Sequence, residues 1–250
     1  MWLWIKIYEI KPFIVNFKIK SGNSKLEDRE LFNQIRNVLK LKVGDKIILS
    51  DGGGNEATAN ILGYKRDFIE VSISDVTVNQ NEADRQVILY CAVLKKENFE
   101  LVVQKATEVG VKEIVPLITE RTIKLNIRRD RLEKIIKEAA EQSGRGIVPI
   151  LRDPVKFNEV IKQVSSNDSN LFFDQSGINL SDLKPNAYNL KPISVWIGPE
   201  GGWTTKEVEL AKELDFKILN LGKLILRAET AAIIGTYFAV HPHTYEALPR

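Results

Sequence analysis

The 250-residue sequence has very little cysteine or histidine. Cys91 is the single cysteine, and the two histidines, His241 and His243, flank Pro242. A metal centre usually draws several ligands from Cys, His and carboxylates at short spacing, so this composition disfavours one. Cys91 stands in an apolar run with no histidine nearby to activate it, which favours a core position over a nucleophile.

Long apolar runs are also missing. No stretch approaches the roughly 18 apolar residues of a membrane span. The apolar start Met1-Trp-Leu-Trp-Ile5 is interrupted by Lys6 and Glu9, without a basic leader or a small-residue cleavage site. Because one cysteine cannot form an internal disulfide, nothing requires an oxidising compartment. We therefore expect a cytoplasmic protein of one or two ordinary domains.

The common phosphate-binding motifs are absent as well. No G-x-G-x-x-G follows an expected strand, and there is no Walker A motif. The glycines Gly52-Gly-Gly54 fall in an expected hairpin with no helix behind them to bind a phosphate. Nucleotide cofactors of the usual kinds are therefore disfavoured.

Net charge gives no strong signal, but its distribution does. The formal net charge is only +3, whereas the stretch from Arg121 to Arg152 holds nine basic residues against four acidic ones. Two interpretations stay open: a solvated helix face with i,i+4 ion pairs such as Asp130–Lys134 and Glu133–Lys137, or a surface that faces nucleic-acid phosphates.

Two domains are expected, divided near Asn79. Residues 1–79 show period-two alternation, as in Phe68-Ile-Glu-Val-Ser-Ile-Ser74, together with one helix at 30–39, and this predicts a small antiparallel barrel. Residues 80–250 alternate strands with helices, which is typical of an α/β domain with a mainly parallel sheet. In that domain we expect strands at 87–94, 111–119, 171–173, 193–197 and 217–221, and helices at 99–109, 130–143, 156–164, 205–214 and 229–240. Gly110 should end the helix at 99–109 as its C′ residue.

One candidate binding segment is Ile197-Gly-Pro-Glu-Gly-Gly202. Its glycines allow positive φ angles and close backbone approach, and Pro199 fixes its own φ. A capping box, Thr204-Thr-Lys-Glu207, follows and should hold the turn against the next helix. Alone, this pattern could be only a tight connection.

A second segment runs from Leu221 to Thr230. Gly222 ends an expected strand, and Arg227-Ala-Glu-Thr230 then opens an otherwise apolar helix. Glu229 and Thr230 could serve only the helix N-terminus. Both segments, however, follow the carboxyl ends of strands, where α/β sheets bind ligands, so we expect them to form one site.

Five ordered motifs resemble the RsmE family of bacterial 16S ribosomal RNA uracil-N3 methyltransferases, in the SPOUT superfamily. They are Gln104-Lys-Ala-Thr-Glu-Val-Gly110, Glu120-Arg121, Glu141-Gln-Ser-Gly-Arg145, Ile197-Gly-Pro-Glu-Gly-Gly202, and Leu221-Gly with Leu226-Arg-Ala-Glu-Thr230. The resemblance implies a PUA-like N-terminal β-barrel and a C-terminal SPOUT domain with a deep trefoil knot. It also implies a homodimer, and it implies transfer of a methyl group from S-adenosylmethionine, without a metal, to N3 of a uridine in 16S ribosomal RNA of the 30S subunit.

The resemblance carries site residues over to this chain. Catalytic roles fall on Arg145, Glu141, Arg227 and Glu229, and Glu200 is a further candidate for the base that takes the N3 proton. RNA-binding roles fall on Arg36, Lys40, Lys95, Arg121 and Arg145. Lys40 stands where the family usually has arginine, and Gln34 where it usually has histidine. Cofactor-binding roles fall on Ile197, Gly198, Pro199, Glu200, Gly201, Gly202, Leu221, Gly222, Leu226, Arg227, Glu229 and Thr230.

Two alternatives remain at this point. A SPOUT methyltransferase could act on tRNA or on a ribose 2′-hydroxyl, which nucleoside mass spectrometry distinguishes from base methylation. A non-catalytic RNA-binding protein of ribosome assembly would bind no cofactor.

Overall fold

The computed structural model describes residues 11–123, 127–164, 169–180 and 193–241. It contains two compact units: unit 1 comprises residues 1–82 and 137–148, and unit 2 comprises residues 83–136 and 149–250. The chain first passes from unit 1 to unit 2 after residue 82, close to the expected division at Asn79. Unit 1 also contains the later segment 137–148.

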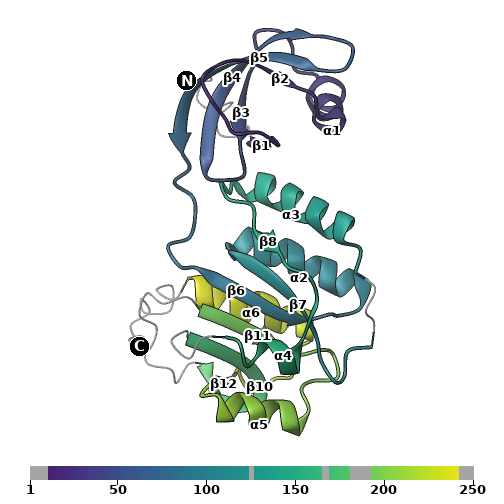
Figure 1. Cartoon of the computed structure of the whole chain (residues 1–250), viewed down its shortest axis with the longest axis vertical. Helices are drawn as coiled ribbons and strands as arrows, with labels where there is room; N and C mark the ends of the chain where they lie inside the picture. The colour runs from purple at the N-terminus through teal and green to yellow at the C-terminus, as the bar shows by residue number, and fades with distance from the viewer. Residues whose placement is uncertain (1–10, 124–126, 165–168, 181–192, 242–250) are drawn as a thin grey trace. The chain divides into compact units, whose positions relative to one another are not determined.

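Unit 1 is built on a five-stranded sheet in the order β1-β3-β4-β5-β2, which Figure 1 draws in purple and blue. All neighbours are antiparallel except β1 and β3. The period-two pattern has the expected result: in β5 the side chains of Ile69, Val71 and Ile73 are buried, while those between them are not. The strands are β1 (Phe13–Ile14), β2 (Gly22–Leu26), β3 (Lys46–Ser50), β4 (Asn55–Tyr64) and β5 (Ile69–Val78).

The helix expected at 30–39 is present in two parts. The α-helix α1 (Arg29–Asn33) starts at Asp28, whose Oδ1 accepts hydrogen bonds from the backbone N–H groups of Glu30 and Leu31. It continues as a π-helical turn, η1 (Gln34–Val38). Leu31 and Ile35 enter the core of unit 1 from these turns.

Unit 2 contains the expected parallel sheet, in the order β12-β10-β11-β6-β7-β8, with β9 also paired to β7. All five residues of β11 are buried, as expected for a strand covered on both faces. The strands are β6 (Val87–Ala92), β7 (Glu113–Ile118), β8 (Ile150–Leu151), β9 (Val155–Lys156), β10 (Ser169–Asn179), β11 (Ile193–Ile197) and β12 (Lys217–Asn220). An α/β fold with a mainly parallel sheet is therefore confirmed.

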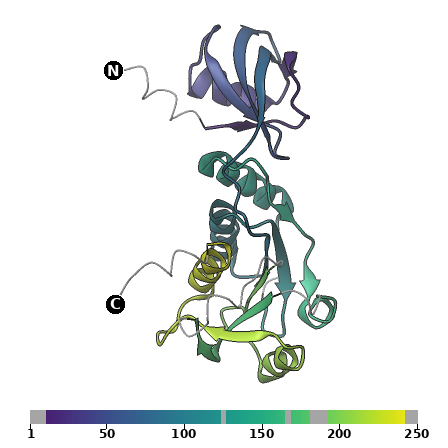
Figure 2. The ribbon, with the colours of Figure 1, turned by 90° about the vertical axis from the view of Figure 1, so that its left-hand side faces the viewer.

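Helices cover both faces of this sheet (Figure 2). On one side lie α2 (Lys96–Val109) and α6 (Ala228–Val240), which pack against each other. On the other side α4 (Phe157–Val160) and α5 (Thr205–Glu213) bury Phe157, Val208 and Ala211 against Phe172 and Trp196 of the strands. The helix α3 (Arg129–Ser143) is shared: residues 129–136 belong to unit 2 and residues 137–143 to unit 1.

In unit 2, three elements differ from the expectation by three residues or more. The helix expected at 156–164 is only the four-residue α4, and its β-branched continuation forms hydrogen-bonded turns, with the Gln163 N–H donating to the Val160 carbonyl. α2 begins at Lys96 rather than at residue 99. β10 extends to Asn179 through a register shift after Phe173, so the polar residues Asp174–Ser176 belong to the strand.

The predicted stop signal at Gly110 is confirmed. Gly110 follows α2 with φ +113° and its N–H bonds back to the Ala106 and Thr107 carbonyls. None of the helices in the described ranges is long and apolar enough to cross a membrane.

Candidate functional site

A cavity of about 960 Å³ opens at the carboxyl ends of β10, β11 and β12 in unit 2. Both glycine segments expected from the sequence meet there. The cavity is lined by Lys95, Asn98, Phe173–Ser176, Ile197–Trp203, Leu219–Gly222, Leu224–Glu229 and Ala231. This position is the one that open α/β sheets use for ligands.

The first segment turns sharply at its glycines. The Gly202 N–H donates to the Pro199 carbonyl at 2.8 Å, and Gly202 has φ +70°, a conformation that favours glycine. Gly198 has no room for a larger residue, because an added Cβ would lie 3.0 Å from the indole of Trp203. That indole is buried, and its Nε1–H donates to the Phe173 carbonyl at 3.1 Å.

The capping box after this turn is confirmed and does more than expected. Thr204 and Glu207 exchange side-chain and backbone hydrogen bonds at the start of α5. The other carboxylate oxygen of Glu207, which is 4% exposed, accepts the Glu120 N–H at 3.0 Å. The turn is thereby tied to the loop that follows β7.

The same turn is held by Glu200, which the resemblance assigned to the cofactor, and by Arg121, which it assigned to RNA. The Glu200 carboxylate accepts the backbone N–H of Lys95, the N-cap of α2, at 2.8 Å. Arg121 donates from Nη1 to the Gly201 carbonyl at 2.7 Å and to the Trp203 carbonyl at 3.2 Å. The Glu200 carboxylate is therefore engaged, which makes it a weaker candidate for a base.

The second segment is more open. Gly222 has φ +114° and its N–H donates to the Asn220 side chain at 3.1 Å. Leu224 and Ile225 are 81% and 82% exposed. At the start of α6 the Glu229 carboxylate is buried and lies 3.9 Å from the guanidinium of Arg227, whose side chain is 85% exposed.

The cavity unites most of the expected cofactor residues. Every one of them lines it except Thr230. Of the four expected catalytic residues, Arg227 and Glu229 line it, whereas Arg145 and Glu141 do not. Of the expected RNA-binding residues, Lys95 is the one among the lining residues of the cavity. Sequence reasoning missed Asn98, Trp203 and the run Asp174–Ser176; a polar run directly after the apolar strand Leu171–Phe173 was the available signal.

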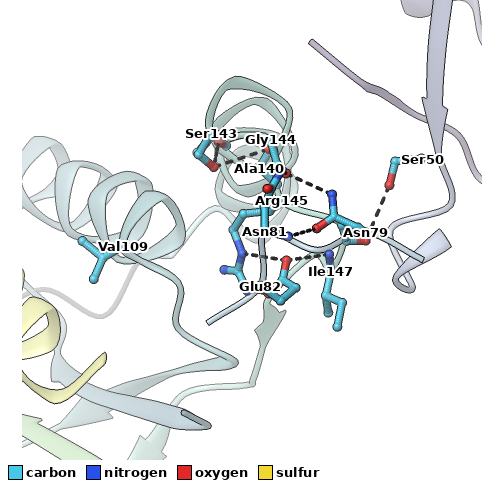
Figure 3. Close-up of polar contacts among 12 residues, drawn as sticks. Ser50, Asn79, Asn81, Glu82, Val109, Ala140, Ser143, Gly144, Arg145 and Ile147 are labelled. Carbon is cyan, nitrogen blue, oxygen red and sulfur yellow. Dashed lines mark hydrogen bonds and ion pairs between the residues drawn. The ribbon is translucent and has the colours of Figure 1, made fainter. Parts of the chain in front are cut away.

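Arg145 lies in unit 1, where its side chain is only 6% exposed. Its Nη2 donates to Glu82 Oε2 at 2.8 Å, and the Ile147 N–H donates to the other oxygen of that carboxylate at 2.9 Å (Figure 3). Beside this pair, the side-chain amide of Asn79 donates to the Gly144 carbonyl at 3.2 Å. These contacts hold the segment 144–147 to residues 79–82.

Glu141 is also engaged within unit 1. Its Oε1 accepts the Ile14 N–H at 2.9 Å. Burial raises the pKa of this carboxyl above its ordinary value, with the Ile14 N–H and the charge of Lys137 acting in the opposite direction. Glu141 thus links the last turn of α3 to β1.

The basic stretch from Arg121 to Arg152 is largely neutralised. At least six of its nine basic residues form ion pairs: Arg128 with Asp130, Arg129 with Glu133 and Asp153, Arg131 with Glu100, Lys137 with Asp28, Arg145 with Glu82, and Arg152 with Glu113. Lys124 lies outside the described residues. An ion-paired surface therefore accounts for this stretch better than a free phosphate-facing one.

The remaining expected residues are the RNA-binding candidates Arg36 and Lys40, the core cysteine Cys91 and the two histidines. In unit 1 the guanidinium of Arg36 lies 5.5 Å from the ring centroid of Phe32 and 5.3 Å from that of Tyr64, and Lys40 has φ +54°. Cys91 is fully buried, which raises the pKa of its thiol, and so it is confirmed as a core residue. The half-buried ring of His241 lies within hydrogen-bonding distance of the Val109 carbonyl, and His243 lies outside the described residues.

Comparisons with known proteins agree with this geometry. Residues 81–238 match a family model described as an RNA methyltransferase domain, and residues 26–74 match one described as an RNA methyltransferase PUA domain. A ribosomal RNA small subunit methyltransferase E from Synechocystis is 35% identical, over 80% of this chain and 67% of the relative. The Rickettsia conorii protein of the same name is 31% identical, over 84% of this chain and 87% of the relative.

Solved structures give the same result. The crystal structure of ribosomal RNA small subunit methyltransferase E from Neisseria gonorrhoeae, bound to S-adenosyl methionine, has a TM-score of 0.84 and 29% sequence identity. It covers 91% of this chain, which in turn covers 95% of that one. The chain therefore belongs to the ribosomal RNA small subunit methyltransferase E family of RNA methyltransferases.

Proposed function

We propose that this protein transfers a methyl group from S-adenosylmethionine to N3 of a specific uridine in 16S ribosomal RNA of the small subunit. The observation that carries the proposal is the convergence of both glycine segments on one cavity at the carboxyl ends of parallel strands. The names of the relatives and the cofactor in the Neisseria neighbour support the same substrate pair. Such a substrate implies action in the cytoplasm.

The residues present fit this cofactor. Ile197, Leu219 and Leu226 offer apolar surface for an adenine ring, while the turn at Gly198–Gly202 and the segment Leu221–Gly222 bring backbone groups to the cavity. An added Cβ at Gly202 or Gly222 would meet no atom within 4 Å, so these glycines leave open space. When bound, S-adenosylmethionine supplies an activated methyl group on its sulfonium.

Proton removal falls to the residues at the start of α6. N3 of uracil carries a proton that must leave before or during methylation. Glu229 lines the cavity and is buried, so we assign it as the acceptor, with Arg227 beside it to stabilise negative charge on the uracil oxygens. Because N3 lies on the pairing edge of the base, the uridine has to be unpaired when it reacts.

Unit 1 is proposed to be the RNA-binding domain. Its match to a PUA model supports this role, and so does the position of Arg36 against two aromatic rings. A closed PUA-like barrel for residues 1–79 and a trefoil knot in residues 80–250 complete the fold that we propose. Part of the connection from β10 to β11, residues 181–192, lies outside the described residues.

A homodimer is proposed on the surface of unit 2. α6 is mostly apolar, yet Ile234 and Tyr237 are 39% and 40% exposed, and Leu224 and Ile225 just before it are more exposed still. Exposed apolar side chains gathered on neighbouring segments favour burial against a partner.

Two measurements test the function. Calorimetric titration with S-adenosylmethionine should give binding without RNA, and incubation with small ribosomal subunits should produce 3-methyluridine, identified by nucleoside mass spectrometry. A ribose-methylated product would assign the enzyme to another reaction, and absence of cofactor binding would leave an RNA-binding protein.

A pair of glycine variants makes the test specific to the cavity. Gly222→Val should abolish cofactor binding, because Gly222 lines the cavity at φ +114°. Gly22→Val is the matched control: Gly22 has φ +123° and the same open surroundings but lies in unit 1. Equal loss in both variants would mean that backbone strain, rather than the cavity, causes the effect.

A further inference from the structure

Arg121 is the first residue of the basic stretch 121–152, but its contacts differ from those of most basic residues there, which form ion pairs. Its neighbours Arg128 and Arg131 pair with carboxylates, whereas Arg121 donates to two backbone carbonyls, those of Gly201 and Trp203. Both carbonyls belong to the turn that lines the cavity. The residue is thus attached to the proposed cofactor site rather than to an acidic side chain.

The stem of Arg121 fits the same turn. An added Cβ at Gly201 would lie 3.5 Å from Arg121 Cδ and 3.6 Å from its Cβ, so the aliphatic part of the side chain lies along the open side of Gly201. The guanidinium can then reach over the turn to both carbonyls. Both bonds come from Nη1, whose two N–H groups the planar guanidinium holds in one plane. A lysine side chain ends one atom earlier, in a tetrahedral ammonium that does not reproduce this geometry.

The turn is fixed at its other points by different groups. Glu200 accepts the Lys95 N–H on one side, and the indole of Trp203 donates to the Phe173 carbonyl on another. Glu207 links the helix after the turn to Glu120, the residue before Arg121. Arg121 supplies the contact at the middle of the turn, between the anchors at Glu200 and at Trp203.

We propose that Arg121 is a positioning residue of the cofactor pocket: it holds the Gly201 and Trp203 carbonyls so that the turn keeps its binding shape before the cofactor arrives. The proposal rests on the proposed function and deepens it, since it moves Arg121 from the RNA-binding set to the cofactor site. A turn fixed in advance loses less conformational freedom on binding, which increases affinity.

Cofactor titration separates this role from a contact with RNA phosphate. Arg121→Met keeps most of the stem and removes the donors, and it should raise the dissociation constant for S-adenosylmethionine, measured without RNA, by about tenfold. Arg121→Lys should fall between Met and wild type. RNA affinity and its salt dependence should stay at wild-type values in both variants. The control is Arg128→Met, which removes an exposed, ion-paired arginine of the same unit and should leave cofactor affinity unchanged.

Each outcome has a distinct meaning. Wild-type cofactor affinity in Arg121→Met overturns the proposal, and a reduced salt slope of RNA binding in the same variant identifies a phosphate contact instead. If the wild-type protein itself binds no S-adenosylmethionine, the proposed function fails. Thermal unfolding of each variant is measured alongside. An Arg121→Lys protein that melts like wild type yet binds the cofactor more weakly supports positioning over a general loss of structure.

Discussion

The two segments that line the cavity differ in how they are held. The turn at Ile197–Trp203 is tied to three neighbouring parts of unit 2: by Glu200 to the start of α2, by Trp203 to β10, and by Arg121 to the loop after β7. The segment Gly222–Arg227 instead presents Leu224 and Ile225 almost fully to solvent. One side of the pocket is fixed by contacts within unit 2, and the other is exposed.

This difference indicates separate tasks. A turn with many internal hydrogen bonds keeps one shape and can bind a ligand with little reorganisation. Exposed apolar side chains stabilise a protein only when they are buried, and here a ligand or a second subunit would bury them. We expect substitutions in the tied turn to affect stability and cofactor affinity, and substitutions in the exposed segment to affect assembly.

The largest effect is expected at Trp203. Trp203→Ala removes a buried indole that packs against Phe172 and Gly198, and it should lower the free energy of unfolding by about 3–5 kcal/mol. Urea unfolding measures this. Ile178→Ala, at a 58% exposed position in the same unit, serves as the control. If Trp203→Ala is as stable as the control, the turn at Ile197–Trp203 is no more firmly held than the exposed segment Gly222–Arg227.

Arg145 extends the comparison to unit 1. Arg145→Ala leaves the Glu82 carboxylate without its buried partner and should cost about 3 kcal/mol of unfolding free energy, with cofactor affinity unchanged. Arg152→Ala, which breaks a more exposed pair with Glu113, should cost less than about 1 kcal/mol. If Arg145→Ala keeps wild-type stability and loses only methyl transfer, Arg145 acts on the substrate directly, as the sequence predicted.

A smaller effect is expected at Glu200. Glu200→Ala removes the acceptor of the Lys95 N–H and should raise the dissociation constant for S-adenosylmethionine about fivefold, from the loss of one hydrogen bond. Calorimetric titration checks it. Glu209→Ala on the exposed surface of α5 is the control. Loss of methyl transfer at wild-type cofactor affinity would assign Glu200 to the chemistry instead.

Glu141 should make stability depend on pH. Its pKa in the folded state is raised by burial, so the folded protein holds this proton more tightly than the unfolded chain. The contribution of Glu141 is then fully present below its ordinary pKa of 4.5 and is lost as pH rises through the raised value. Glu141→Gln should reduce this decline in urea-unfolding curves recorded across the range. An unchanged decline would show that other groups cause it.

The smallest effect on stability is expected in the exposed segment. The double substitution of Leu224→Ser and Ile225→Ser should change the unfolding free energy by less than about 0.5 kcal/mol, because these side chains are exposed in the single chain. Sedimentation velocity should show a larger monomer fraction than in wild type. A loss of stability at concentrations where the protein is monomeric would mean that the segment packs within its own chain.

Local signals in the sequence predicted much of the fold. Alternation in Ile69–Ile73 predicted a half-buried strand, Gly110 the end of α2, and Thr204 with Glu207 a capping box, and all three are confirmed. Each depends on residues only a few positions apart. The short helix α4 and the long strand β10 were predicted less well, because sheet pairing extends β10 through polar residues whose own propensity disfavours a strand.

The sequence by itself determined the parallel α/β architecture of unit 2, the antiparallel sheet of unit 1, and the two glycine segments of one pocket. Only the tertiary structure decided what the charged residues contact. Arg121 meets carbonyls 80 and 82 positions away, and Arg145 meets Glu82 at a separation of 63. Periodicity and caps follow from neighbours along the chain, whereas the partner of a long charged side chain depends on which distant segments the fold brings within its reach.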